Sequence, residues 1–501
     1  MDRDTILTLL RKAATFEQKM DSYADYQVYY NVVHKARERI EQMGADAVEA
    51  LIEALADDDY RVRGLAASLL GKIGDARANA VLWEALARED QEDARRAIRN
   101  ALSRLRDERH IAQLVRELSS ADPAVRAEAV RLLSKTNEDA LIPHILDALD
   151  DPEPLVRNAA LSALGYNRDQ KIAHITHILE RLHDEDATVR LTAVTMLARS
   201  MLKDTRIFEG ILRATDDPDP AVRRAALRAL SDFNDERAID AYLDHIEDPD
   251  LNVREAAMRG LHEVSPPQAL QPLIDFVGRY VMQDDQGWFW LVAATLGELG
   301  DPAAIPALIQ MLQHPNDQLR PAAVTALINI GHSAMIEPLR ALLTHQDAEV
   351  RLYAALILGR LGQLELLDTL RALAQQDPDP QVREAAEKAV ALCEARAREK
   401  ADLAYLLEKL AALLAVEGLP KLDKIRETLR DLSQHRDPQV LAPLGQLTEN
   451  RFPSLRRAAL QALGNLGMAA ARPYIEARLD DESIMVRLAA RHALQQLEHT
   501  E

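Results

Sequence analysis

Cysteine is almost absent from this chain, in which Cys393 is the single residue of its kind among 501. One thiol cannot form an intramolecular disulfide, and it cannot supply a thiolate zinc cluster. The apolar neighbours Ala391 and Leu392 indicate that Cys393 is a small buried core residue. The sequence therefore excludes a disulfide framework and a cysteine-ligated zinc site.

Aromatic residues and long apolar runs are also scarce. Phe, Trp and Tyr make up 4% of the chain, so a core must be built from Leu, Ala, Val and Ile, which suits closely packed helices. No apolar stretch reaches the roughly 18 residues that indicate a membrane span. The N-terminus lacks the basic start and apolar stretch of a signal peptide. We therefore expect a cytoplasmic protein without a membrane-spanning segment.

Basic residues are outnumbered by acidic ones, 61 to 81, which gives a formal net charge of -20. Affinity for a phosphate backbone comes from clustered Lys and Arg, so this balance disfavours nucleic acid as a partner. A local basic groove within an acidic protein is still compatible with the composition.

What the chain has in abundance is one recurrent phrase: an acidic turn, then Val-Arg or Leu-Arg, then small apolar residues. The arginines of neighbouring phrases are 31 to 33 residues apart where the series is unbroken. They are Arg63, Arg126, Arg157, Arg190, Arg223, Arg254, Arg320, Arg351, Arg383, Arg456 and Arg487. A constant period of this length is typical of stacked repeats, in which each unit buries its apolar face against the next.

Residues 216–245 illustrate how one unit is built. The prolines of the turn at 216–220 cannot continue a helix, and Asp219 is placed to cap the free amides of the next helix. Apolar residues at helical spacing predict helices over 221–230 and 237–245, with a turn over 231–235. One unit is therefore a helical hairpin.

The recurrent arginine lies at the start of the second helix, beside an apolar residue, and the acidic turns recur with the same period. We interpret these residues as a ladder of Arg–carboxylate contacts between adjacent repeats, with bidentate geometry available. The alternative is an arginine array that faces a ligand.

Residues 217–230, which read Asp-Pro-Asp-Pro-Ala-Val-Arg-Arg-Ala-Ala-Leu-Arg-Ala-Leu, resemble the short HEAT repeats named after phycobilisome lyases. The resemblance covers nearly the whole chain. It implies an all-α fold, an alpha-alpha superhelix (HEAT-repeat solenoid) of about 13 helical hairpins. Similar repeats occur in bilin lyases, in a DNA alkyl-base glycosylase family, in cofactor-metabolism proteins and in many adaptors, so the resemblance leaves the function open.

The period divides the chain into four expected segments. They are an N-terminal helical cap (1–44), a repeat array (45–392), a helical insertion (393–435), and C-terminal repeats with a cap (436–501). The insertion is expected because Arg383 and Arg456 are 73 residues apart, and it is interpreted as a hinge, an arm or a dimer contact. The last helix carries Arg491, Gln495 and Gln496, as expected of a solvent-facing terminal cap.

The concave face of a solenoid is its usual binding surface, and here the second helices should line it. Positions +1 and +5 from each recurrent arginine leave the apolar stripe and share one helix face. These positions bring together Arg224, Arg228 and Arg259, next to Trp290. The group suits an acidic peptide, a phosphate or a planar anionic ligand. The alternative is an ordinary polar face with ion pairs to nearby glutamates.

Other aromatic residues have a packing interpretation. Trp288 takes the place of the core valine in its unit. In the expected cap, large rings would cover the exposed end of the first repeat, or the tyrosines would form a docking patch. These rings are Phe16, Tyr23, Tyr26, Tyr29 and Tyr30.

Motifs for catalysis or for a cofactor are missing: the chain has no GxGxxG, Walker, GxSxG or calcium-loop pattern. His174 and His177 have a spacing that can place two metal ligands on one helix face, but no further ligand pattern accompanies them. We expect no catalytic residue, no metal and no cofactor, which favours a role other than that of an enzyme.

Three hypotheses for the function follow. The first is a non-enzymatic scaffold or adaptor that binds a protein or peptide on its concave face. The second is a bilin lyase-like or other tetrapyrrole-handling protein, for which the Arg224, Arg228 and Trp290 group would suit propionates and a planar ring. The third is a nucleic-acid-binding solenoid, which the acidic charge opposes. The sequence leaves the partner and the oligomeric state open.

Overall fold

The computed structural model describes most of the chain. The residues described are 3–16, 34–136, 138–165, 174–200, 202, 204–281, 289–315, 319–415 and 422–498. They fall into two compact units, Met1–Gly210 and Ile211–Glu501, and each is treated by itself below. Every regular element among these residues is helical, which confirms the expected all-α repeat fold.

No helix among the described residues is long and apolar enough to cross a membrane.

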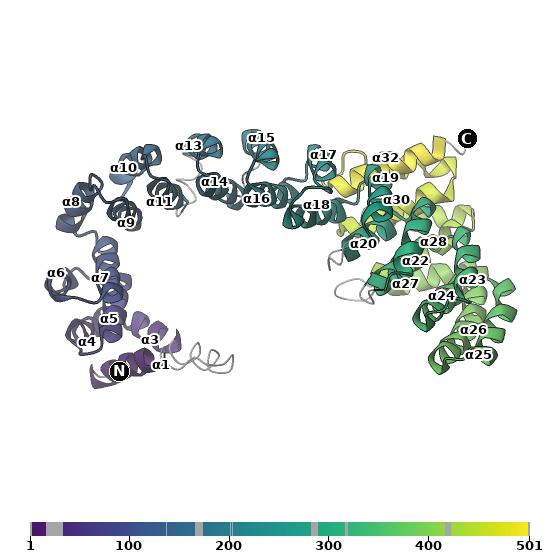
Figure 1. Ribbon diagram of the computed structural model, residues 1–501, viewed down its shortest axis with the longest axis horizontal. Helices are drawn as coiled ribbons and strands as arrows, with labels where there is room; N and C mark the ends of the chain where they lie inside the picture. Colours follow the sequence, from purple (N-terminus) through teal and green to yellow (C-terminus); the bar gives the residue numbers. More distant parts are fainter. Residues whose placement is uncertain are drawn as a thin grey trace. The chain divides into compact units, whose positions relative to one another are not determined.

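The first unit begins with α1 (Arg3–Phe16) and α3 (Lys35–Met43), which precede its helical hairpins. The hairpins are α4/α5 (Val48–Ala54, Tyr60–Ile73), α6/α7 (Ala78–Arg88, Glu92–Arg104), α8/α9 (Glu108–Glu117, Pro123–Leu133), α10/α11 (Ile142–Asp147, Pro154–Leu164) and α13/α14 (Ile175–Glu180, Ala187–Arg199). In this unit the second helix of each hairpin lies on the inner side of the curved row and the first helix on its outer side (Figure 1).

The second unit continues the series from within α15. Its hairpins are α15/α16 (Thr205–Arg213, Pro220–Leu230), α17/α18 (Arg237–Asp244, Leu251–Val264), α19/α20 (Leu270–Tyr280, Phe289–Leu299), α21/α22 (Ile305–Leu312, Leu319–Ile330), α23/α24 (Ile336–Leu342, Ala348–Leu361), α25/α26 (Leu367–Gln376, Pro380–Ala401), α27/α28 (Leu403–Leu414, Leu422–Ser433), α29/α30 (Leu441–Leu447, Pro453–Leu466) and α31/α32 (Arg472–Glu476, Ile484–Glu498).

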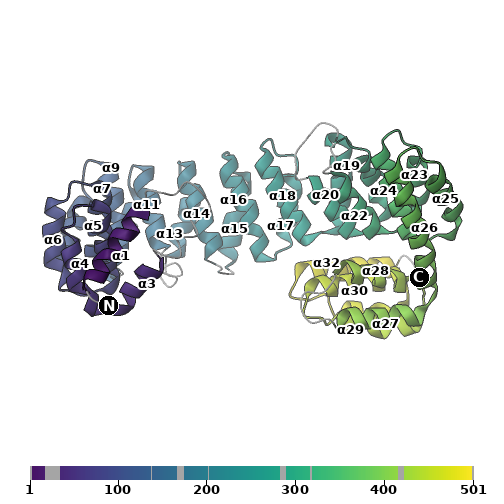
Figure 2. The ribbon, with the colours of Figure 1, turned by 90° about the horizontal axis from the view of Figure 1, so that it is seen from below.

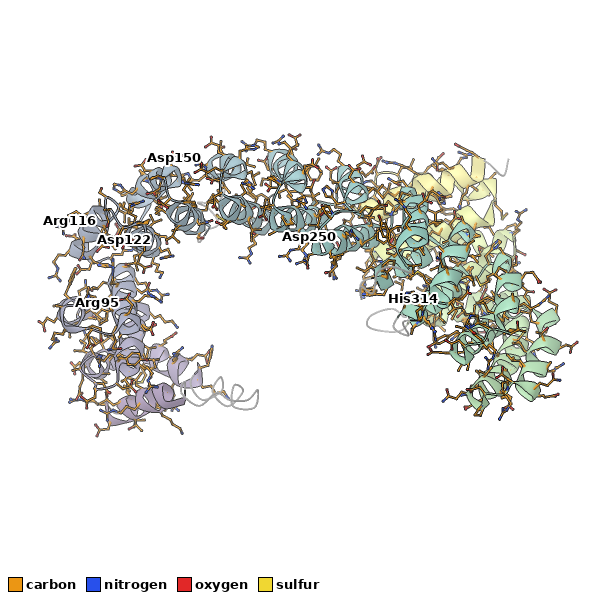
Figure 3. The ribbon with its side chains drawn as sticks, in the orientation of Figure 1. Arg95, Arg116, Asp122, Asp150, Asp250 and His314 are labelled. Atoms are coloured by element: carbon orange, nitrogen blue, oxygen red, sulfur yellow. The ribbon has the colours of Figure 1, made fainter. Side chains whose placement is uncertain are left out.

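Local sequence accounts for where these helices begin and end. Asp219 caps α16 as expected, since its carboxylate accepts a hydrogen bond of 2.8 Å from the amide of Ala221. Asp122 and Asp250, which are labelled in Figure 3, cap α9 and α18 in the same way. The helix expected over 221–230 is α16, and the following turn contains the 3-10 segment Ser231–Phe233.

Most of the recurrent arginines join consecutive repeats, as the ladder interpretation predicted. Arg157 of α11 donates through Nη1 to the carbonyls of Asp151 and Pro152 in its own turn, at 2.9 and 3.0 Å. Through Nε and Nη2 it donates to both carboxylate oxygens of Asp184, in the turn of the next repeat. The same two-sided contact is made by Arg63 with Glu89, Arg126 with Asp151, Arg223 with Asp248 and Arg351 with Asp377. These arginines are therefore structural contacts between repeats.

The ladder is replaced by aromatic packing at α20. Phe289 stands where the period places an arginine, it is fully buried, and its ring lies 5.5 Å from that of Phe276. Trp288, predicted to be a core residue, lies outside the described residues.

Small residues set how closely some repeats approach one another. A Cβ added to Gly359 of α24 would lie 2.7 Å from the Cα of Ala389 in α26. A Cβ added to Gly71 or to Gly297 would lie at the same distance from the Cα atom of Ala101 or of Ala326, respectively. Cys393, also in α26, is buried as predicted.

The segment expected to be an insertion comprises the end of α26 with α27 and α28. Arg396 of α26 forms ion pairs with Glu427 and Asp431 of α28, and both Arg396 and Asp431 are buried. After it, the hairpins α29/α30 and α31/α32 lie beside α20 and α22 of the same unit (Figure 2). The expected boundaries at residues 44, 392 and 435 remain predictions.

Candidate functional site

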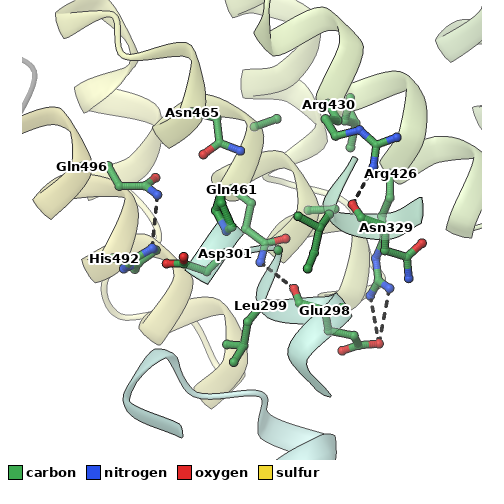
Figure 4. Close-up of a pocket in the computed structure, with 17 residues that line it drawn as sticks. Glu298, Leu299, Asp301, Asn329, Arg426, Arg430, Gln461, Asn465, His492 and Gln496 are labelled. Carbon is green, nitrogen blue, oxygen red and sulfur yellow. Dashed lines mark hydrogen bonds and ion pairs between the residues drawn. The ribbon is translucent and has the colours of Figure 1, made fainter. Parts of the chain in front are cut away.

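Glu298, at the end of α20, is the centre of the contact between the two parts of the second unit. Its carboxylate accepts hydrogen bonds from Arg457 of α30 at 3.2 Å and from Arg426 of α28 at 3.3 and 3.4 Å. Its backbone carbonyl accepts from Arg457 and from Gln461, both at 3.1 Å. Glu298 thus contacts both α28, in the segment expected to be an insertion, and α30, in the C-terminal repeats (Figure 4).

The charges of this cluster depend on one another. Burial by itself would raise the pKa of Glu298, but Arg457 and Arg426 outweigh it and lower that pKa below its ordinary value. Burial lowers the pKa of Arg457 to about 10, although Glu298 opposes the shift. Both groups therefore remain charged at neutral pH, and each compensates for the burial of the other.

A second contact links α32 to the turn before α17. The side chain of Asn234 accepts from the amide of Ile484 at 2.8 Å, at the start of α32. Arg487 donates to Glu236 at 3.4 Å. Arg491 pairs with Glu236 at 2.6 Å. On this side α32 contacts an earlier repeat, whereas Arg491 and Gln495, which were named for the expected terminal cap, are exposed. The cap remains a prediction.

Between these contacts lies a cavity of about 140 Å³. Arg430 of α28 donates to the carbonyls of Ile328 and Asn329 at the end of α22, at 2.7 and 2.5 Å, beside the cavity. Its other polar walls include Asp301, Asn465, His492 and Gln496, as Figure 4 shows. The volume and lining suit a few ordered waters or a small polar molecule.

The predicted binding group lies on three consecutive second helices. Arg224 and Arg228 are on α16, Arg259 is on α18 and Trp290 is at the start of α20. Arg228 and Arg259 are exposed, Arg224 is half-buried, and Trp290 is 44% exposed.

Arg259 pairs with Glu255 at 2.7 Å. For this one arginine of the three, the contact agrees with the alternative interpretation of an ordinary polar face with ion pairs. The ring of His262 meets Trp290 edge-on, with ring centroids 6.1 Å apart. Arg224 and Arg228 form no ion pair with any residue in the described part of the chain.

The possible docking patch of Tyr23, Tyr26, Tyr29 and Tyr30 lies outside the described residues. Phe16 is the last residue of α1.

His174 and His177, which were considered as possible metal ligands, have ring centroids 6.0 Å apart. Within the described ranges, no group of three or more His, Cys, Asp and Glu residues could hold a metal ion.

Sequence reasoning missed the Glu298 cluster. Glu298 and Arg457 are 159 residues apart, and each looks like one more charged residue at the edge of its repeat. The one available signal for the cluster was the pair Arg456-Arg457, in which a second arginine follows the ladder arginine. The same pair occurs in α16, where Arg224 follows Arg223. The pattern therefore does not indicate whether Arg224 or Arg457 is the buried arginine.

With the geometry established, the sequence can be compared with known proteins. A family described as HEAT repeats matches residues 13–103, 84–165, 175–250, 211–281, 239–326, 284–352, 305–391, 336–413 and 407–495. The chain belongs to the HEAT-repeat family. No curated protein matches its sequence.

Solved structures of HEAT-repeat and related proteins resemble it in fold. The complex of CpcE and CpcF of phycocyanin lyase from Nostoc sp. PCC7120 is 21% identical, over 52% of this chain and 93% of that chain, with a TM-score of 0.29. Kap121p bound to Pho4p is 16% identical, over 94% of this chain and 58% of that chain, with a TM-score of 0.50. Importin beta is 13% identical, over 99% and 78%, with a TM-score of 0.41. At these identities the likeness concerns the fold alone.

Proposed function

We propose that this protein is a non-enzymatic scaffold that binds a partner protein or peptide on the face formed by Arg224, Arg228, Arg259 and Trp290. The main support is that Arg224 and Arg228 form no ion pair with a described residue, although acidic residues outnumber basic ones in the chain. The ladder arginines of the same repeats, such as Arg223, are fully engaged.

The chemistry of this face suggests the kind of partner. Guanidinium groups bind carboxylates through paired, charge-assisted hydrogen bonds. An exposed tryptophan beside them offers a large apolar surface, and Trp and Arg are enriched among residues that dominate binding energy at interfaces. An acidic segment that also carries an apolar or aromatic side chain fits this group.

Affinity purification with single charge-reversal variants tests the proposal. A partner captured by the wild-type protein should be lost from Arg228→Glu. It should be kept by Arg213→Glu, which makes the same charge change at an exposed residue of the first helix α15. Both variants should melt at the wild-type temperature. A partner that Arg228→Glu retains with wild-type affinity would contradict the assignment of this face.

The other two functions give different readouts with the same variants. Uptake of a bilin with a change in visible absorbance, lost in Trp290→Ala, would favour a tetrapyrrole-handling protein. A salt-sensitive mobility shift with DNA, lost in Arg228→Glu, would favour a nucleic-acid-binding solenoid.

A further inference from the structure

A second cationic surface lies in the first unit, on the second helices α7 and α9. The positions +1, +5 and +9 from the ladder arginine share one face of a helix. In α7, where Arg95 occupies the ladder position 32 residues after Arg63, they hold Arg96, Asn100 and Arg104. In α9 with its following 3-10 turn they include Arg131 and Lys135. We call these five residues the α7–α9 basic face.

The charges on this face are only partly balanced. Arg96 and Arg131 are exposed and pair with Asp93 and Glu128 on their own helices, and ion pairs of solvent-accessible arginines are weak. Arg104 is exposed and forms no ion pair with an acidic residue within the described ranges.

Lys135 is the least exposed cation of the face. It is half-buried and donates to the Oδ1 atom of Asn100, a neutral acceptor on the neighbouring helix. Burial lowers its pKa, and Arg104, Arg131 and Arg96 add to that effect while Glu128 opposes it. Three arginines are therefore close enough to Lys135 to act on its charge.

We propose that the α7–α9 basic face binds an extended acidic segment of a partner protein. Arg96 and Arg104 are two helical turns apart, about 12 Å along α7, and packed helices lie about 8–10 Å from each other. One phosphate or carboxylate cannot span that area. Side chains on one side of an extended peptide recur about every 7 Å, so two to four acidic side chains can reach these cations together.

The limited width of the face favours a peptide over a nucleic acid. The +1 and +5 positions of the helices on either side are neutral: they are Gly64 and Ser68 in α5, and Asn158 and Ser162 in α11. The +9 position of α5 is Lys72, whose charge is paired with Glu41. A phosphate backbone gains affinity when a long run of its charges is neutralised, and this face is too narrow to neutralise such a run. The surface is separate from the Arg224, Arg228, Arg259 and Trp290 group, and each can fail without the other.

Fluorescence anisotropy with the full-length chain tests the inference. The probe is a fluorescein-labelled peptide in which eight glutamates alternate with serines. Arg96→Gln/Arg131→Gln should weaken its binding at least tenfold. The matched control is Arg88→Gln/Arg116→Gln, which removes two exposed arginines from the first helices α6 and α8 and should change binding less than twofold. Figure 3 shows Arg116 on the outer helix α8.

Each other outcome would overturn the inference. Equal weakening in the two double variants would mean that the peptide responds to net charge alone. No binding by the wild-type protein would exclude the site. Loss of binding in Arg224→Gln/Arg228→Gln with none in Arg96→Gln/Arg131→Gln would assign the peptide to the second unit. Tighter binding of a 20-residue oligothymidylate to the same face would identify nucleic acid as its ligand. All variants must melt at the wild-type temperature for the comparison to count.

Discussion

Arg157 and Asp184 form a bidentate ion pair between adjacent repeats, with Nε–Oδ2 and Nη2–Oδ1 distances of 2.8 and 2.7 Å. Both side chains are almost completely buried, at 5% and 4% exposure. Nη1 of Arg157 is bound to two carbonyls of its own turn, so the guanidinium holds two successive turns together.

Breaking this pair should destabilise the first unit. Asp184→Asn removes the charge and leaves Arg157 buried opposite a neutral group, which should cost about 3 kcal/mol of unfolding free energy. The matched control is Asp204→Asn, whose partner Arg206 is 60% exposed and which should cost at most about 1 kcal/mol. Urea unfolding followed by circular dichroism measures both. Equal shifts of the two midpoints would show that the buried pair is no stronger than the exposed one.

Glu298→Gln should loosen the C-terminal repeats from the array. The variant removes the charge that compensates for buried Arg457, at an expected cost of about 3 kcal/mol, and faster exchange should appear first in α30 and α32. Hydrogen exchange measured by mass spectrometry would detect a rise of roughly 100-fold in those helices. Glu337→Gln is the control, since Glu337 is an exposed partner of Arg340. Unchanged exchange in α30 would contradict the role of Glu298.

The same cluster has a defined sign of pH dependence. Because the pKa of Glu298 is lowered in the folded state, its contribution to stability is complete above the ordinary carboxyl range. That contribution is lost as the pH falls through the lowered value. Contact between α20 and α30 should therefore weaken in acid in the wild-type protein and show less acid dependence in Glu298→Gln.

Gly359→Ala should destabilise the protein although alanine favours helices. The added methyl group would meet the backbone of Ala389 at 2.7 Å, and such overpacking costs about 1–3 kcal/mol. The control is Gly278→Ala in α19, where no atom lies within 4 Å of the new Cβ. That variant should gain up to about 1 kcal/mol from helix propensity. Thermal melting that rises for both variants would show that α24 and α26 can separate without loss.

His110 should make the first unit sensitive to mild acid. The residue is buried against Trp83 and Ser103, and burial followed by the charge of Arg99 lowers its pKa to about 4. The unfolded chain binds a proton near pH 6.5, so stability present above that value is lost as the pH falls towards 4. Between pH 7 and pH 5 the loss from this group should be about 2 kcal/mol.

Urea midpoints at pH 7 and pH 5 measure this effect. His110→Gln cannot take up a proton and should show a smaller difference between the two midpoints than the wild-type protein does. His183→Gln, at an exposed position, should leave the difference unchanged. An equal pH dependence in the wild-type protein and His110→Gln would assign the acid sensitivity to other groups.

The repeats could be predicted because their causes are local. Three sequence features account for them: proline and aspartate in the turns, apolar residues at helical spacing, and an arginine once per period. Each of these residues makes its contacts within about one repeat of its own position. This is why the helix at 220–230, the cap at Asp219 and the partner of Arg157 agree with the sequence. The binding group around Arg228 was derived from the same register and remains a proposal.

The Glu298 cluster could not be predicted in the same way. Its partners come from helices more than 100 residues away, and no period relates their positions. Arg457 and Arg224 each directly follow a ladder arginine. Sequence alone also does not show that Arg457 is buried whereas Arg224 is half-buried. The difference depends on which repeat packs over each helix.

The sequence by itself therefore determined the all-helical repeat fold and the ladder that joins consecutive units. Tertiary structure alone decided that the last repeats contact the turn before α17 and the ends of α20 and α22, that Arg487 pairs with Glu236, and that Glu298 lies half-buried between two arginines. The physical reason is distance along the chain: neighbouring repeats are related by the period, whereas contacts between distant repeats depend on how the chain turns after α26.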